Sequence, residues 1–144
     1  MRRINTLVLC FCLLLGLLQG CGRGSGNSDI DFAQNTMELL MKGNAAADDA
    51  LDWESLQWMG ESTTELYRVL PKTEKAGYRW AFISTAATQL RSMQASPETF
   101  SNWRVVSQDA TQTMIMADIS QEAKLRVTVT KRTGEPKVSA ISIG

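Results

Sequence analysis

The sequence predicts an α+β fold in which N-terminal helices pack on an antiparallel sheet of four strands. Apolar residues recur with a helical period of about 3.6 from Asp29 to about Gln94. After Trp103 the period changes to 2, which is typical of strands with one buried face. Helices followed by consecutive hairpin-linked strands favour an antiparallel sheet with the helices on one face.

The first predicted helix spans residues 29–42 and ends at Gly43, a residue type that commonly terminates helices. Its apolar residues form a single stripe: Ile30, Ala33, Met37, Leu40 and Met41. Asn44 is expected to begin a second, acidic helix that reaches about Met59. A short helix is then expected from Thr64 to Leu70, ahead of Pro71.

A long helix is predicted from about Glu74 to Gln94. No charged residue lies between Trp80 and Leu90, so we expect this helix to be central and covered on several sides. Ser96-Pro97-Glu98 then predicts one further helical turn, with serine as the cap and proline in the first position.

The four strands are expected to follow one another as hairpins, at residues 103–108, 112–119, 124–130 and 137–143. In the third strand Leu125, Val127 and Val129 point to one face, and the charged and threonine residues between them point to the other. Thr133-Gly134-Glu135-Pro136 connects the last two strands.

Charge is unevenly distributed along a chain whose net charge is zero. Residues 29–65 contain nine acidic residues and one basic residue, whereas residues 66–144 contain eleven basic residues and six acidic ones. Two interpretations are open: the two parts attract one another within one domain, or they form a bipolar surface that orients a charged partner or the anionic membrane. The balance is unlike that of a nucleic-acid-binding protein.

The N-terminal segment has the order of a secretory signal. Arg2 and Arg3 are followed by a mostly apolar run at residues 7–18 and by a small residue, Gly20. The sequence Leu18-Gln19-Gly20-Cys21 resembles the lipobox of bacterial lipoproteins. The resemblance implies that the Cys21 thiol receives a diacylglycerol, that the chain is cut between Gly20 and Cys21, and that the new N-terminus is acylated with chains such as palmitate.

We therefore expect a signal peptide at residues 1–20, a lipidated flexible tether at residues 21–28 and one small domain at residues 29–144. In the lipoprotein family Gly22, rather than an aspartate, after the cysteine implies an outer-membrane protein facing the periplasm. The lipid bilayer would then be its first partner. The apolar run is shorter than the roughly 20 residues of a transmembrane helix. An ordinary cleaved signal without lipid is the remaining alternative.

Few residues are suited to catalysis. The chain has no histidine, and processing would remove Cys10 and Cys12 and modify Cys21, which leaves the mature domain without a free thiol. We expect no enzyme activity, cofactor or metal. The acidic cluster of Asp48, Asp49, Asp52 and Glu54 has oxygen ligands that calcium favours. Without a calcium-binding loop it is expected to be a solvated face. Asp109 and Asp118 are lone carboxylates that are expected to close turns.

Two segments resemble the nuclear transport factor 2-like (cystatin-like) superfamily. They are Met41-Lys42-Gly43-Asn44, between two predicted helices, and the hairpin of residues 125–143. The resemblance implies a curved sheet wrapped around helices, often with a conical pocket. It implies no particular reaction, since the superfamily includes enzymes, binding modules and dimerisation domains. Pro136-Lys137-Val138 stands where many members carry an aromatic residue.

The leading functional hypothesis is a periplasm-facing lipoprotein whose non-catalytic domain binds another envelope protein or a small ligand. It predicts an apolar patch with Met114 and Met116 on the exposed sheet face or at the mouth of a pocket. The alternatives are an enzyme with a carboxylate base, Asp118 or Asp109, and a module that forms homodimers through its sheet. Eight aromatic residues are expected in the core, and the alternative interpretation is that some of them line a pocket or partner surface: Trp53, Trp58, Tyr67, Tyr78, Trp80, Phe82, Phe100 and Trp103.

Overall fold

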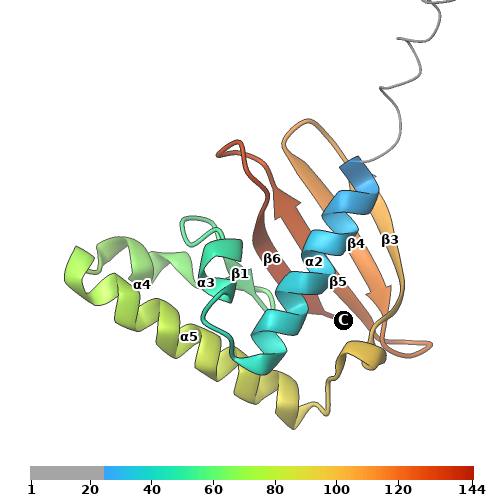
Figure 1. The fold of residues 1–144 in the computed structure, drawn as a ribbon, viewed down its shortest axis with the longest axis horizontal. Coiled ribbons are helices and arrows are strands. Elements are labelled where there is room, and N and C mark those ends of the chain that lie inside the picture. The colour runs from blue at the N-terminus through green and yellow to red at the C-terminus, as the bar shows by residue number, and fades with distance from the viewer. Residues whose placement is uncertain (1–24) are drawn as a thin grey trace, which may run out of the picture.

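The computed structural model describes residues 25–144. The expected signal peptide, the cleavage site at Gly20 and Cys21, and the first half of the expected tether lie outside the described residues. The described chain is α+β, as predicted, but its sheet has six strands instead of four and is mixed (Figure 1). The elements are α2 (Ser25–Lys42), α3 (Ala47–Ala50), β1 (Gln57–Trp58), β2 (Glu61–Ser62), α4 (Thr64–Val69), α5 (Lys72–Ser92), a 3-10 turn (Pro97–Thr99), β3 (Ser101–Gln108), β4 (Gln112–Asp118), β5 (Lys124–Thr130) and β6 (Lys137–Ile143).

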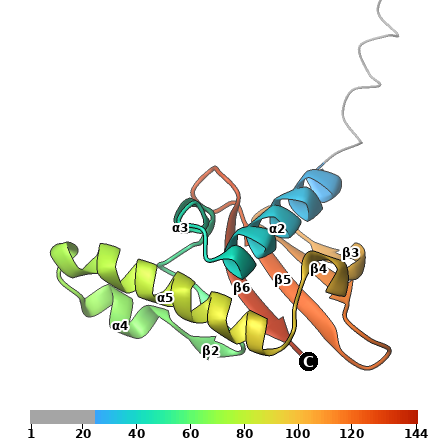
Figure 2. The same ribbon diagram turned by 60° about the horizontal axis from the view of Figure 1, so that its bottom comes forward.

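The strand order is β2-β1-β6-β5-β4-β3. Strands β3 to β6 form the antiparallel meander that the sequence predicts, and β6 has the predicted bounds. The additional hairpin, β1–β2, joins the sheet through a parallel pairing of β1 with β6. Helix α2 crosses one face of the sheet, and α5 packs against α2 and α3 (Figures 1 and 2).

Helix α2 begins earlier than predicted. It starts at Ser25, so four residues assigned to the flexible tether are helical and the expectation of a tether up to residue 28 is wrong for them. The helix ends as predicted at Gly43, which has a φ of 63°. The Gly43 and Asn44 amides donate to the carbonyls of Leu40 and Leu39, at 3.0 and 2.9 Å, which satisfies the last carbonyls of the helix.

The predicted acidic helix from Asn44 to Met59 is wrong: only residues 47–50 are helical. The Asp52 amide donates to the Val138 carbonyl at 2.8 Å, and β1 continues this pairing along β6. Met59 and Gly60 have φ values of 53° and 86°, as a tight turn between paired strands requires. Pairing with a strand about 80 residues later in the chain therefore overrides the helical periodicity of this segment.

Helix α5 is not covered on several sides, contrary to expectation. Its buried residues lie on one face only: Ile83, Ala86, Ala87 and Leu90. Trp80 is 54% exposed, and the serine and threonine residues of the uncharged stretch face solvent. Small and hydroxyl-bearing residues leave a helix uncharged without making it apolar, which explains the difference.

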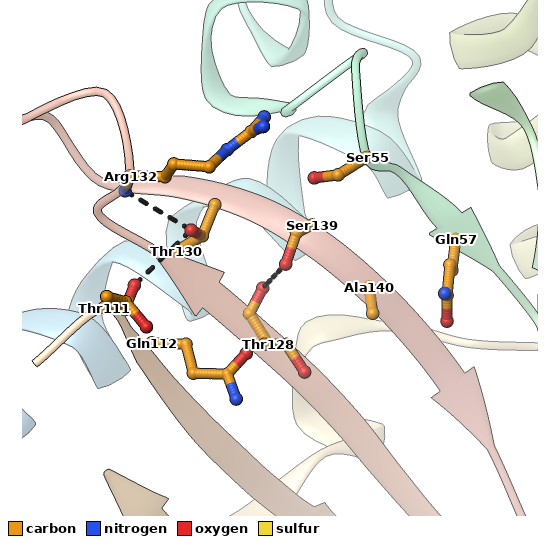
Figure 3. Close-up of a pocket in the computed structure, with 9 residues that line it drawn as sticks. All are labelled: Ser55, Gln57, Thr111, Gln112, Thr128, Thr130, Arg132, Ser139 and Ala140. Carbon is orange, nitrogen blue, oxygen red and sulfur yellow. Dashed lines mark hydrogen bonds between the residues drawn. The ribbon is translucent and has the colours of Figure 1, made fainter. Parts of the chain in front are cut away.

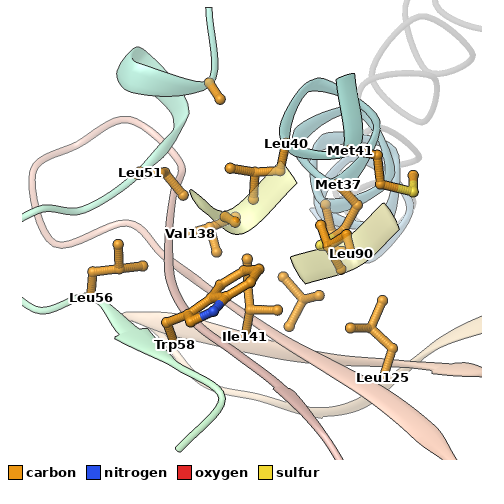
Figure 4. Close-up of a cluster of buried hydrophobic side chains, with 14 of the residues drawn as sticks. Met37, Leu40, Met41, Leu51, Leu56, Trp58, Leu90, Leu125, Val138 and Ile141 are labelled. Carbon is orange, nitrogen blue, oxygen red and sulfur yellow. The ribbon is translucent and has the colours of Figure 1, made fainter. Parts of the chain in front are cut away.

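The core lies between α2 and the covered face of the sheet, by which we mean the face on which α2 packs (Figure 4). Alternate residues of β4, β5 and β6 supply it, as their period of 2 predicts. On the sheet side these fully buried residues are Ile115, Ala117, Leu125, Val127, Val129, Val138 and Ile141. The intervening residues form the open face.

Candidate functional site

Of two cavities considered within residues 25–144, the larger is a polar hollow of about 490 Å³ on the open face of the sheet (Figure 3). Strands β1, β4, β5 and β6 and the adjoining loops supply its walls. The lining residues are Ser55, Gln57, Thr111, Gln112, Thr128, Thr130, Arg132, Ser139 and Ala140. Such a volume lies within the range of about 300–1,000 Å³ that is usual for small-molecule sites.

The alternation of side chains along the strands explains why most of these residues face the cavity. Gln112, Thr128 and Thr130 alternate with buried residues of the covered face, so they point away from the core. In β6 the pairing skips Ser139, because Thr128 is opposite Ala140 and Val129 is opposite Val138. This β-bulge interrupts the alternation, so that both Ser139 and Ala140 line the cavity.

Arg132 supplies the only charged side chain among the lining residues, and a buried carboxylate holds it in place. Its Nη2 donates to both oxygens of Asp52, at 3.2 and 3.0 Å, and Asp52 is only 7% exposed. The Ser55 hydroxyl also donates to Asp52, at 2.6 Å. The carboxylate thus fixes the arginine and one rim of the cavity while neutralising much of the arginine charge.

Several polar groups of the cavity are free to bind a ligand. Within residues 25–144, the Gln57 side-chain amide, the Thr128 hydroxyl, and Nε and Nη1 of Arg132 make no hydrogen bond, whereas the Gln112 side chain is hydrogen-bonded to Asp109. Thr130 and Ser139 make long hydrogen bonds. The Thr130 hydroxyl donates to the Thr111 carbonyl and accepts from the Arg132 amide, both at 3.4 Å, and the Ser139 hydroxyl donates to the Thr128 carbonyl at 3.5 Å. The site therefore offers amide, hydroxyl and guanidinium groups to a polar compound.

A smaller cavity of about 210 Å³ lies between α2 and the chain around the start of β3. Its lining residues are Gln34, Met37, Glu38, Met41, Pro97, Phe100 and Trp103. Phe100 and Trp103 pack edge to face with ring centroids 6.1 Å apart. Glu38 forms an ion pair with Lys42. Thioether and aromatic groups thus line this cavity together with the Gln34 amide and the Glu38 carboxylate.

Met114 and Met116 lie on the open face, as predicted, but line neither of these cavities. Met114 is 37% exposed, and Val106 is exposed at the neighbouring irregularity of β3. Arg104 donates to the Met116 sulfur at 3.4 Å. The apolar surface of this face is thus small and bordered by charged and hydroxyl groups, and the expectation that the methionines form a pocket mouth is wrong for these cavities.

Asp109 and Asp118 also lie outside both cavities. Asp109 closes the β3–β4 turn, where hydrogen bonds from Thr111 and Gln112 lower its pKa. The Asn102 amide, Lys124 and Arg104 surround Asp118 and lower its pKa to about 2. Both carboxylates have structural partners, and neither has the raised pKa that favours a general base at neutral pH.

The predicted cluster of Asp48, Asp49, Asp52 and Glu54 does not form one surface, because most of the predicted helix from Asn44 to Met59 is not helical. Asp48 pairs with Arg79 at 2.7 Å, Asp52 with Arg132, and the Asp49 carbonyl accepts from Lys137. Within residues 25–144 no group of three or more carboxylate, imidazole or thiol side chains could hold a metal ion.

Four ion pairs join the acidic residues 29–65 to the basic residues 66–144 in the described part of the chain. They are Glu54–Arg68, Asp48–Arg79, Asp29–Lys131 and Asp52–Arg132. Two of these carboxylates, Asp29 and Asp52, are buried. The pairs match the interpretation that the two parts of the chain attract one another within one domain.

Most of the aromatic residues serve the core. Trp53 contacts the rings of Tyr67, Tyr78 and Phe82, with centroids 5.4–6.5 Å apart, and Phe82 also contacts Trp58. The structure separates these rings from the larger cavity and brings only Phe100 and Trp103 to the smaller one.

The residues of the larger cavity are absent from the sequence-based candidates. The alternation of Thr128 and Thr130 with valines indicates a polar sheet face but gives no sign of a hollow. Gln57 and Ser55 fall within the segment that was wrongly expected to be helical. Their approach to β5 and β6 depends on the long-range pairing of β1 with β6.

Comparisons with known proteins yield no relative: no protein-family model, curated protein or solved structure matches the chain. None of the helices in residues 25–144 has both the length and the apolar character needed to cross a membrane.

Proposed function

We propose that this chain is an envelope lipoprotein, anchored through acylated Cys21, whose domain binds a small polar ligand without catalysis. The observation that carries the binding proposal is the lining of the larger cavity. Its walls offer the free Gln57 amide, hydroxyls and an oriented guanidinium, and none of its nine lining residues carries a carboxylate, imidazole or thiol. These groups hydrogen-bond a ligand but do not supply a general base or nucleophile at neutral pH.

The character of the ligand follows from the electrostatics of the cavity. Asp52 already pairs with Arg132, so the cavity has little net charge and suits a neutral compound with several hydrogen-bonding groups. Ligands of this kind would rely on directional contacts to Gln57, Thr128 and the free N–H groups of Arg132.

The lipoprotein part of the proposal depends on the lipobox-like sequence. Cells fed labelled palmitate are expected to label the protein, and Cys21→Ser is expected to abolish both the label and sedimentation with membranes. A protein that stays unlabelled, and that Cys21→Ser leaves unchanged in size and fractionation, would contradict membrane anchoring.

The binding proposal is tested by photo-crosslinking in living cells. A photoreactive amino acid in place of Gln112, inside the cavity, is expected to capture a small polar compound, detected as a mass increase of the protein. The same amino acid in place of exposed Glu122 is the matched control and should capture nothing comparable. Thr128→Val should reduce the adduct at position 112. Equal capture at both positions, or none at either, would overturn the binding proposal.

One observation favours a second function, homodimerisation through the open face. Met114 and Val106 form an exposed apolar surface on adjacent strands. Sedimentation equilibrium of the chain without residues 1–21 tests it. If this face joins two copies, Met114→Lys converts a dimer to a monomer.

A further inference from the structure

The start of α2 places the domain close to the proposed lipid anchor. Only residues 22–24 separate Cys21 from the first helical residue, Ser25. A fully extended chain spans at most about 3.5 Å per residue, so Ser25 lies within about 14 Å of the Cys21 backbone. This is a much shorter link than the tether that the sequence predicts, because four of its expected residues belong to the helix.

A buried contact fixes the beginning of α2 to one end of the sheet. Asp29, which is 2% exposed, accepts a hydrogen bond of 2.7 Å from the Thr113 hydroxyl and one of 2.9 Å from Lys131 Nζ. Thr113 lies near the start of β4, and Lys131 follows the end of β5. Helix α2 therefore cannot swing away from the sheet without leaving a buried carboxylate unpaired.

The same end of the sheet carries two exposed connections, the β3–β4 turn (residues 109–111) and the β5–β6 loop (residues 131–136), beside the first turns of α2 (Figure 1). We call it the proximal end. The distal end, with the β4–β5 turn (residues 119–123), lies at the other end of these strands. Strand β4, which joins the two ends, has 7 residues and so spans about 24 Å at about 3.4 Å per residue, which sets the scale of this separation.

We propose that the proximal end rests on the headgroup layer of the bilayer that holds Cys21, and that the distal end points away from it. This inference depends on the proposed acylation of Cys21. The short link to Ser25 and the Asp29 contact together restrict how far the domain can tilt, so the anchor sets an orientation as well as a location.

The chemistry of the proximal end fits polar headgroups and not the hydrocarbon core. None of the exposed large apolar residues of the described chain lies in residues 109–111 or 131–136. Lys131 and Arg132 are already paired with Asp29 and Asp52. Since these charges are compensated, the contact should need no anionic lipid, and the acyl chains supply the affinity.

The orientation has a consequence for the larger cavity. Thr111, Gln112, Thr130 and Arg132 line it from the proximal end, so the cavity lies next to the headgroup layer. Its ligand would then be a polar compound that is accessible at the bilayer surface.

Energy transfer from defined positions to the membrane tests the orientation. The mature acylated chain has no other thiol, so Ala110→Cys, Glu135→Cys and Glu122→Cys each create a unique labelling site. The labelled proteins are reconstituted in phosphatidylcholine vesicles that contain an acceptor-labelled lipid. We expect transfer from positions 110 and 135 to exceed that from position 122 by about twofold or more, given the separation of about 24 Å. Equal transfer, or greater transfer from position 122, would overturn the inference.

A lengthened link provides the matched control. Twelve glycine and serine residues inserted after Gly24 leave the domain intact and should reduce the difference between proximal and distal labels. An undiminished difference would show that the link does not set the orientation and would overturn the inference. Failure of the proposed function is distinguishable: a chain that lacks the mass of the acyl chains and does not float with vesicles contradicts the anchor itself, whereas one that floats without a proximal preference contradicts only the orientation.

Discussion

The two faces of the sheet differ although they are built from the same strands. On the covered face, β4 and β5 present Ile115, Ala117, Leu125 and Val127, all fully buried beneath α2. On the open face the residues between them are polar, charged or thioether-bearing, and one part is hollowed into the larger cavity. The covered face supplies the hydrophobic free energy of folding, and the open face is available for ligand contacts.

Each face also contains one polar contact that contributes to the structure in a way the rest of that face does not. The covered face contains a buried polar contact at the proximal end, between Asp29 and Thr113. The open face contains a structural ion cluster at the distal end, where Asp118 lies between Arg104 and Lys124. Substitutions at these positions, compared with substitutions of nearby residues that lack such contacts, can therefore separate the contribution of each face to stability.

The largest effect is expected from the covered face. Leu125→Ala removes a fully buried side chain and leaves a cavity under α2, which should lower the free energy of unfolding by about 2–5 kcal/mol. Urea denaturation of the chain without residues 1–21 measures it. Arg126→Ala, the adjacent residue on the open face, is the control. Similar losses for the two variants would contradict the division between the faces.

The buried polar contact comes next. Asp29→Ala leaves the fully buried Thr113 hydroxyl and the Lys131 ammonium without their partner, and it should cost about 1–3 kcal/mol. Exposed Asp31, on the same helix, is the matched control, and Asp31→Ala should change stability by less than about 0.5 kcal/mol. If both variants unfold at the same urea concentration, Asp29 does not hold α2 on the sheet.

A smaller effect, seen as a pH dependence, is expected at Asp118. Its folded-state pKa of about 2 lies below the ordinary value of 3.8, because Asn102, Lys124 and Arg104 favour the carboxylate. Its contribution to stability is therefore complete above about pH 4 and is lost as the pH falls through 2. Carboxyl-carbon NMR should give a midpoint near pH 2.

Asn102→Gly provides the variant for this titration, since glycine accepts the backbone φ of 51° found there while the amide is removed. The Asp118 midpoint should rise toward 3.8, and the depressed pKa of Asp109 should stay unchanged. A midpoint already near 3.8 in the unsubstituted protein would show that the ion cluster is not formed in solution.

The smallest effect is expected for an exposed position of the open face. Met114→Thr exchanges a partly exposed thioether for a good strand former, so stability should change by less than about 0.5 kcal/mol. Thermal unfolding measures it. A loss above 1 kcal/mol would mean that another surface covers Met114 in solution, as a homodimer would.

Local sequence patterns predict the parts of this fold whose partners are near in the chain. The alternation at Leu125, Val127 and Val129, the hairpin to β6 and the end of α2 at Gly43 are confirmed, because short-range periodicity and backbone conformation determine them. The acidic segment fails for the opposite reason. Leu51 and Trp58 have helical spacing, yet their segment pairs with Val138 and Ile141 of β6.

The candidate site is harder to predict than the fold for the same physical reason. Arg132 and Asp52 are 80 positions apart, and neither belongs to a recognisable motif. Their pairing, and the hollow beside it, arise from the arrangement of the β5–β6 loop and the chain after α3. No periodicity within either segment carries that information.

By itself the sequence determined the α+β class and the buried face of the meander, and its lipobox-like segment is the basis of the proposed anchor. These features depend on the side-chain period and on short motifs, which act over a few residues. Only the tertiary structure decided that β1 joins β6, that acidic side chains are distributed among separate cations, and that a polar cavity lies on the open face. Each of these depends on contacts between segments far apart in the chain, whose free energy appears only when the whole domain is folded.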